Sequence, residues 1–426
     1  MSFRALGIPE ISLRHLKAML LVAKYRNLTK AAAKLNRSQT AITKAISELE
    51  RDLGVELFDR SSTGMIPTIY GSILAKRVER VAAEFEAAGE AYLDYKKGAR
   101  QQQNNPIFSM EVSYKRLAAV IALHDRKDIG AAASLLGITR AAVYSSLRQL
   151  EELLDLPIFE RSPYGFSSTA YCRVLVRHVK LAFSQLRHAL DELDSLNGVT
   201  SGHLVIGTLP YTRTIMTPRA ITRVLEESPG LRISTEEGPY ALLEAALRCG
   251  ELDLIVGAIR PLQADDDLIT EKLFEDRLSV IARRGHPLEQ RRGLSFSDLQ
   301  RYSWVLPASN SPSRQLFDKL LEVEGLEAPA CVIETSSLSN VRGLLLESDR
   351  LALLSEHQIY YEKKYGLLGA LPLELRDTYR PIGVTMRAHT PPSPAAELFL
   401  KCIRGVALDL LHDEQSNERA AAAASS

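Results

Sequence analysis

The chain has 426 residues, of which 46% are hydrophobic and 25% charged, a composition typical of packed globular domains rather than disordered or fibrous chains. No stretch of about 18 apolar residues occurs and the N-terminus lacks a long apolar segment, so we expect a cytoplasmic protein without membrane contact. The four cysteines have no CxxC pairing, the nine histidines no ligand spacing, and no nucleotide-binding or catalytic motif is present. These features predict no metal, no cofactor and no enzyme.

The net charge of +1 conceals a difference between the two halves of the chain. Residues 1–198 contain 28 basic and 21 acidic side chains, whereas residues 199–426 contain 25 and 31. A basic front and an acidic back indicate that the front half binds a polyanion.

The first segment with regular periodicity predicts three helices and a hairpin. Residues 13–25 carry apolar side chains at helical spacing, and Thr29 begins a second, short helix. Ser38 is a good N-cap for a third helix that ends near Leu53. The following residues, 55–68, alternate apolar and polar around a turn, which is typical of a β-hairpin wing. Two short helices joined by a tight turn form a helix-turn-helix.

The outer face of the third helix is chemically suited to DNA. A glutamine at its start can pair with adenine, threonines can contact a thymine methyl or a phosphate, and lysine or arginine can bind phosphates or guanine. The candidate DNA-binding residues of this module are Arg37, Ser38, Gln39, Thr40, Thr43, Lys44 and Arg60.

The same module returns further along the chain. Residues 13–71 match 114–172 at a constant offset of 101, through pairs such as Phe58 with Phe159 and Tyr70 with Tyr171. Two units, each long enough for its own core, indicate tandem domains rather than a solenoid. The first copy has ten basic and five acidic residues over 13–70, and the second has seven and six over 114–171. We therefore expect the first copy to dominate DNA affinity.

The segment 28–60, LTKAAAKLNRSQTAITKAISELERDLGVELFDR, resembles the winged helix-turn-helix of the LysR-type transcriptional regulators. The second copy, 129–161, is similar but has Arg140 in place of Gln39, Tyr144 in place of Thr43 and Asp155 in place of Gly54. DNA contact and reduced DNA affinity both fit these changes, and a protein-interaction or oligomerisation module is the alternative. If it binds DNA, its candidate residues are Thr139, Arg140, Arg148 and Arg161.

Each module is followed by a long amphipathic run, 71–97 and 172–196. Apolar residues in the second run recur at spacings of three and four, which predicts a helix packed along another helix. In the family such a linker helix pairs two subunits, so the resemblance implies a homodimer or homotetramer joined through 172–196. The expected parts are a first head with linker helix at 11–98, a flexible linker at 99–109, a second head with linker helix at 110–198, an α/β domain at 203–412 and a disordered tail at 413–426.

From residue 203 onward, short apolar strands alternate with helices, which predicts an α/β sheet with binding crevices at the strand ends. The pattern resembles the two-lobed effector domain of the same family, a fold shared with periplasmic solute-binding proteins. Helix N-termini in such folds bind small anions. The candidate effector residues are Tyr211, Thr212, Arg213, Tyr240, Ser309, Asn310, Ser311, Arg314, Thr335 and Ser336.

The resemblance implies a ligand-responsive regulator that binds double-stranded DNA. We expect a small carboxylate-bearing effector, an aromatic or sugar acid, to close the lobes and rearrange the DNA heads, with RNA polymerase as a further partner. An enzyme or a cytosolic binding protein is the alternative for the α/β region. The sequence identifies neither the effector nor the operator, nor whether the output is activation or repression.

Overall fold

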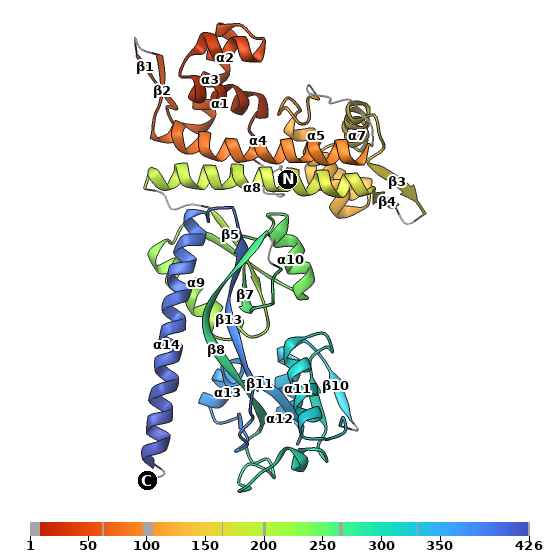
Figure 1. Cartoon of the computed structure of the whole chain (residues 1–426), viewed down its shortest axis with the longest axis vertical. Coiled ribbons are helices and arrows are strands. Elements are labelled where there is room, and N and C mark those ends of the chain that lie inside the picture. Colours follow the sequence, from red (N-terminus) through yellow and green to blue (C-terminus); the bar gives the residue numbers. More distant parts are fainter. Residues whose placement is uncertain are drawn as a thin grey trace. The chain divides into compact units, whose positions relative to one another are not determined.

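The computed structural model describes residues 9–61, 64–96, 105–163, 165–198, 202–263, 267–329 and 331–424 (Figure 1). The chain divides into two compact units, Met1–Ser201 with Cys249–Glu251 and Gly202–Arg248 with Leu252–Ser426. In the described part, no helix is both long and apolar enough to cross a membrane.

The N-terminal unit contains two heads of the same construction, each with three helices, a two-stranded wing and a long linker helix. The structure confirms the helices and wings expected from the repeat. The first head comprises α1 (Leu13–Tyr25), α2 (Leu28–Leu35), α3 (Gln39–Leu53), β1 (Phe58–Ser61), β2 (Gly64–Pro67) and α4 (Ile69–Tyr95). The second comprises α5 (Tyr114–Arg126), α6 (Ile129–Leu136), α7 (Arg140–Leu154), β3 (Phe159–Ser162), β4 (Gly165–Ser168) and α8 (Ala170–Leu196).

Equivalent local contacts give the two heads one backbone design. Ser38 caps α3 by accepting a hydrogen bond from Ala41 N, and Thr139 caps α7 in the same way from Ala142 N. The wing is fixed to the core alike in both, since Thr68 N donates to Leu57 O and Thr169 N donates to Ile158 O, each at 3.0 Å.

The linker helices α4 and α8 pack side by side along their length (Figure 1). They run antiparallel, because Tyr70 near the start of α4 donates to Asn197 after the end of α8, and Tyr92 near the end of α4 contacts Tyr171 at the start of α8. The apolar stripe of α8 is buried in this seam at Val176, Val179, Phe183, Leu186 and Leu193, opposite Leu74, Val78, Val81, Phe85, Ala88 and Tyr92 of α4.

This seam corrects the expectation that helix 172–196 joins two subunits. Its partner is α4 of the same chain, since the duplicated head supplies a second linker helix whose apolar stripe covers the first. The stripe therefore gives no evidence for an interface between chains.

Polar contacts fix the register of the seam. The Arg77 guanidinium is buried and donates to Gln185 Oε1 at 2.9 Å and to Glu192 Oε1 at 3.1 Å, while His178 Nδ1 lies 2.8 Å from Glu84 Oε2. A buried charge of this kind is best satisfied in one alignment of the helices, which disfavours slipped pairings.

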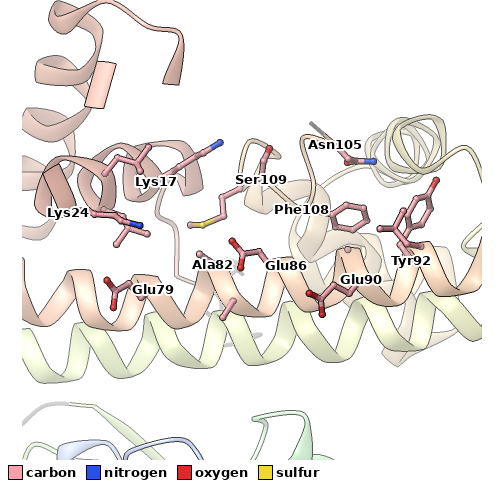
Figure 2. Close-up of a pocket in the computed structure, with 16 residues that line it drawn as sticks. Lys17, Lys24, Glu79, Ala82, Glu86, Glu90, Tyr92, Asn105, Phe108 and Ser109 are labelled. Atoms are coloured by element: carbon pink, nitrogen blue, oxygen red, sulfur yellow. The ribbon is translucent and has the colours of Figure 1, made fainter. Parts of the chain in front are cut away.

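Residues 105–111, which we call the strap, connect the two heads. The expectation of a flexible linker at 99–109 is wrong for residues 105–109, which belong to the strap and pack against both heads. Residues 99–104 lie outside the described part, but Ile107 and Met110 are buried. Asn105 Nδ2 donates to Leu153 O of the second head, and Lys17 of the first head pairs with Glu111 at 2.8 Å. Figure 2 shows strap residues facing α1 and α4 across a pocket of about 730 Å³.

The C-terminal unit is a two-lobed α/β domain, as expected. Its sheet has the order β10-β9-β11-β8-β13-β7-β5-β6, with β12 paired to β8. The strands are β5 (His203–Thr208), β6 (Arg232–Glu237), β7 (Leu254–Ala258), β8 (Leu268–Arg283), β9 (Trp304–Leu306), β10 (Val332–Glu334), β11 (Leu351–Ser355), β12 (Leu368–Ala370) and β13 (Tyr379–Arg387). The helices are α9 (Met216–Glu227), α10 (Tyr240–Arg248), α11 (Pro312–Val323), α12 (Leu338–Leu346), α13 (Tyr360–Lys364) and α14 (Pro394–Ala424), with 3-10 turns at Phe296–Leu299 and Glu356–Ile359.

Parallel strands build both lobes, and β8 connects them. In the first lobe β5 pairs in parallel with β6 and β7, and in the second lobe β9 pairs in parallel with β10 and β11. The first half of β8 pairs with β13, and its second half pairs with β11 and β12.

The expected disordered tail, 413–426, is also corrected. Helix α14 extends to Ala424 and so includes most of this segment.

Candidate functional site

The reading helix of the first head is α3. Gln39 is its first residue and is exposed, and its side-chain amide Nε2 donates to Thr29 Oγ1 of α2 at 2.9 Å. Thr43, one turn later, donates to the Gln39 carbonyl at 3.0 Å. The amide that we expect to pair with adenine is thus held at the N-terminal end of α3 by a neighbouring helix.

The other candidates of the first head surround this point. Arg37, Ser38 and Thr40 are exposed in the turn and first turn of α3, and the Lys44 side chain is 76% exposed with a long contact to Glu48. The structure therefore brings these residues together on one face. The side chain of Arg60 lies outside the described residues.

The reading helix of the second head is α7, which begins with Arg140. The Arg140 guanidinium lies against Gly130, where a Cβ atom would be 2.8 Å from its terminal nitrogen. By the repeat offset, Gly130 replaces Thr29 and Arg140 replaces Gln39. The two heads therefore differ at both positions: the first has a hydrogen-bonded pair, Gln39 with Thr29, and the second has a cation against a glycine.

A cation–aromatic cluster connects α7 of the second head to its wing. The Arg161 guanidinium donates to the Tyr144 hydroxyl and lies 5.5 Å from the ring centres of Tyr144 and Phe166. This arginine, expected to bind a phosphate, is therefore held against α7. Arg148 is exposed, as expected for a DNA contact. The cluster was not expected from the sequence, although the replacement of Thr43 by Tyr144 was its signal.

The two reading faces differ most in charge. Lys30, Lys34, Arg37 and Lys44 of the first head correspond to Ala131, Leu135, Ile138 and Ser145 of the second. These four cations of the first head have uncharged counterparts, whereas Arg140 and Arg148 of the second head replace the uncharged Gln39 and Ser47. Phosphate contacts set nonspecific affinity and its salt dependence, and the first head keeps the larger number of cations on these positions.

The second candidate site is a cavity of about 130 Å³ between the lobes of the C-terminal unit. The loops that line it follow the carboxyl ends of parallel strands, where ligands bind in open α/β sheets. Leu209 and Tyr211 follow β5, Arg260 follows β7, and Ser311 and Thr335 follow β9 and β10. Aliphatic side chains, among them Val305, Val341 and Leu353, form much of the wall.

A buried polar network supports one side of this cavity. Arg380 of β13 donates to Asp276 Oδ2 at 3.2 Å and to Ser313 Oγ at 2.8 Å, and its guanidinium lies 5.2 Å from the Tyr211 ring. Asp276 also accepts from Ser355 Oγ at 2.6 Å, and Tyr211 OH lies 3.0 Å from His357 Nδ1. The carboxylate of Asp276 therefore compensates the positive charge of Arg380.

Arg260, which also lines the cavity, has no acidic partner among the residues that the structure describes. No described residue forms an ion pair with its guanidinium, which stacks on Tyr240 at 5.1 Å. Its buried Nε has no hydrogen-bond partner in the described part of the chain. Burial lowers the pKa of Arg260, with Arg380 lowering it further and Tyr240 opposing both. An anion in the cavity would stabilise this cation.

Four of the ten candidate effector residues line the cavity: Tyr211, Ser311, Thr335 and Ser336. Ser309, Asn310 and Tyr240 are outside its lining, and the first two are exposed in the turn before α11. Three other side chains hold the scaffold instead. Thr212 donates to carbonyls of Leu209 and Val256, Arg213 donates to Thr208 O and pairs with Glu237, and Arg314 pairs with Asp318.

Sequence reasoning missed Arg260, Arg380, Ser313 and Gln358 among the lining residues. Arg260 comes two residues after the buried strand β7, a position that topology brings to the cavity. Arg380 lies within β13, which starts at Tyr379, and not in a loop after a strand end, where the effector residues were expected.

Comparison with known proteins agrees with this geometry. Residues 197–407 match the LysR substrate binding domain, and residues 13–72 and 114–173 each match the bacterial regulatory helix-turn-helix protein of the lysR family. The HTH-type transcriptional regulator GalR of Pseudomonas putida is 35% identical over 395 residues, covering 93% of this chain and 97% of that protein. The part of this chain outside the alignment is shorter than either 60-residue head match. The alignment with GalR therefore includes at least part of both heads.

Other relatives align over less of the chain. The regulator PcaQ of Agrobacterium fabrum is 30% identical over 300 residues, which are 70% of this chain and 96% of PcaQ. Two solved structures share the fold: a cysteine-to-aspartate variant of full-length OxyR from Pseudomonas aeruginosa has a TM-score of 0.54 at 22% identity, covering 69% of this chain and 95% of that one. CbnR, a LysR family transcriptional regulator, has a TM-score of 0.51 at 15% identity, and the match covers 70% of this chain and 99% of CbnR.

The chain belongs to the LysR family of transcriptional regulators. It is a ligand-responsive, DNA-binding regulator and not an enzyme, which removes the enzyme and cytosolic binding-protein alternatives for the α/β domain. Members of the family bind DNA and small effectors and form oligomers.

Proposed function

We propose that the effector of this regulator is a small ring-bearing carboxylic acid that binds between the lobes with its carboxylate on Arg260. The observation that supports this most directly is the guanidinium of Arg260, which lines the cavity without an acidic partner among the described residues. Aliphatic walls favour an aromatic acid over a sugar acid, because a sugar would leave hydroxyls facing apolar groups. Ser311 and Thr335 supply the polar contacts that orient it.

Binding at this point biases the two lobes toward one arrangement. The cavity walls come from loops of both lobes, so a ligand that contacts both has higher affinity for the closed form. The Arg380 network couples Tyr211, which follows β5, to Ser313 in α11. We propose that this closure is transmitted to the DNA heads.

The test is binding of a panel of benzoic and sugar acids, with their neutral amides, to full-length protein by calorimetry. Arg260→Ala should weaken binding of the preferred acid about 10- to 150-fold, since a charge-assisted hydrogen bond contributes about 1.5–3 kcal/mol. Arg314→Ala is the matched control, because that arginine pairs with Asp318 outside the lining. Amides that bind as tightly as acids, or an Arg260→Ala variant that binds normally, would contradict the proposal.

Ser311 gives a second test with a transcriptional readout. A bulky residue here, as in Ser311→Phe, fills the cavity and should abolish the effector's influence on transcription while DNA binding persists. The substitution also removes the α11 N-cap, a cost of about 1 kcal/mol, so folding is checked by circular dichroism. A normal effector response would place the ligand elsewhere.

For DNA, we propose that the first head supplies most of the affinity. Gln39→Ala should cost about 1–3 kcal/mol at a specific site and relax base preference there. An equal loss from Arg140→Ala, with none from Gln39→Ala, would reverse the order of the heads.

We further propose that the chain works in the cytoplasm, where its DNA is, as a homodimer or homotetramer that contacts RNA polymerase. Because the α4–α8 seam is filled within the chain, association has to use another surface. Sedimentation of the purified protein measures the number of chains, and transcription with purified polymerase tests the second contact.

A further inference from the structure

The arrangement of α4 and α8 relates the two heads by an approximate two-fold axis. Contacts across a two-fold axis come in exchanged pairs. If one residue of the first repeat contacts the copy of a second residue, then that second residue contacts the copy of the first. The seam shows this exchange: Arg77 contacts Gln185, and Glu84 contacts His178, where His178 is the copy of Arg77 and Gln185 the copy of Glu84.

Each head is attached to its own linker helix in the same manner, so the axis applies to the heads too. Thr68 and Thr169 cap α4 and α8 and hold the wings by matching backbone bonds. The strap adds contacts with both heads through Asn105 and Glu111. Because the linker helices run antiparallel, the heads lie at opposite ends of the seam (Figure 1).

A two-fold pair of reading helices matches the two-fold symmetry of DNA and reads inverted half-sites. Here the two reading helices differ at their first residue. Gln39 has the geometry to bond adenine N6 and N7, whereas Arg140 has the geometry to bond guanine O6 and N7. The Arg140 guanidinium lies against Gly130 in the structure.

We propose that one chain is a complete DNA-reading pair for an asymmetric site: two inverted half-sites that differ in sequence, with an A·T pair under Gln39 and a G·C pair under Arg140. This inference rests on the proposed DNA-binding function of both heads. The first head holds the duplex through its four cations, and the second contributes base discrimination with less phosphate contact.

The experiment begins with selection of bound sequences from a pool of randomised duplexes by the full-length protein. Unlike inverted half-sites are expected. Arg140→Gln should then change the preferred base from G to A in one half only, and Gln39→Arg from A to G in the other half only, with discrimination of about 5- to 150-fold in each case. Arg140→Lys, which keeps the charge but loses the fork geometry, should lose the base preference and retain the salt dependence.

A second measurement tests whether the pair lies within one chain. Chains carrying Gln39→Ala and chains carrying Arg140→Ala are co-expressed with different tags, and the mixed complex is purified. Each chain has one impaired head, so the mixed complex should bind the selected site about as weakly as the single variants do. Recovery of wild-type affinity would show that the reading pair forms between chains and would overturn the proposal.

The outcomes separate this inference from the function on which it rests. If no sequence is enriched, specific DNA recognition itself fails. If the enriched site is symmetric, has a single half, or is unchanged in base preference by Arg140→Gln, DNA binding stands and the asymmetric pair is wrong.

Discussion

The two heads of this chain share a backbone but differ on the exposed face of their third helix. Caps, wing anchors and core positions are equivalent in both, as with Ser38 and Thr139 or Phe58 and Phe159. Four cations on the first reading face correspond to uncharged residues on the second. The comparison shows that the fold depends on the buried and capping positions, while the exposed positions determine what each head binds.

The largest effect is expected from separating the heads. Leu186→Lys in α8 removes apolar contacts whose loss costs about 2–5 kcal/mol in a leucine-to-alanine change, and it also buries a charge. The N-terminal unit should unfold at lower denaturant and lose DNA binding. Leu196→Lys, at a position that is 42% exposed, is the control. A folded Leu186→Lys protein of reduced oligomer size would instead restore the subunit-interface interpretation.

A smaller effect should distinguish the junctions between wing and linker helix. A Cβ on Gly71 would lie 2.0 Å from Leu57 O, whereas the equivalent residue of the second head is Cys172, whose burial raises the pKa of its thiol to about 12. Gly71→Ala should therefore destabilise the first head by about 1–3 kcal/mol, since the backbone has to shift. Hydrogen exchange of the α1–α4 amides measures this, with Cys172→Ala as the comparison. If Gly71→Ala and Cys172→Ala reduced the hydrogen-exchange protection of their own heads equally, the two junctions would be alike and the prediction would be wrong.

The electrostatic difference can be transferred between heads. Lys44→Ser removes a phosphate contact from the first head, and Ser145→Lys adds one to the second at the equivalent position. The slope of log K against log salt should change by about 0.9 in opposite directions in the two variants. DNA titrations at several salt concentrations check this. An unchanged slope for Ser145→Lys would mean that α7 does not approach the phosphates.

The weakest predicted effect concerns the contact of the strap with the first head. Lys17 lowers the pKa of Glu111 below its usual range, so the folded state favours the ionised carboxylate. The pair therefore stabilises the protein at neutral pH, and this contribution is lost as the pH falls below the usual glutamate range through the lowered pKa. Glu111→Gln should remove that pH dependence and cost less than about 1 kcal/mol, as for exposed pairs. This pH dependence is tested by measuring unfolding midpoints of the wild type and of Glu111→Gln from about pH 3 to about pH 7, an interval that includes the usual pKa of glutamate.

Much of the fold followed from local patterns, because caps and apolar periodicity act over a few residues. Ser38 and Thr139 predicted the starts of the reading helices, and the offset of 101 predicted the second head. The first half of β8 does not follow from such a pattern, since residues such as Glu271, Lys272 and Glu275 interrupt its apolar residues.

The sites were less predictable, because they depend on residues far apart in the sequence. Hydroxyls after strand ends indicated Ser311 and Thr335, but only the sheet order brings Arg260 and Arg380 to the same cavity. The apolar stripe of α8 was also correct as a seam. Periodicity shows which face of a helix is covered and does not show which chain covers it.

The covalent connection between α4 and α8 has a consequence for protein abundance. Association of two separate chains follows mass action and fails when copies are scarce. Two helices in one polypeptide meet at an effective concentration set by the intervening residues, whatever the number of molecules present. A cell can therefore keep very few copies of this chain without losing the pairing of its heads.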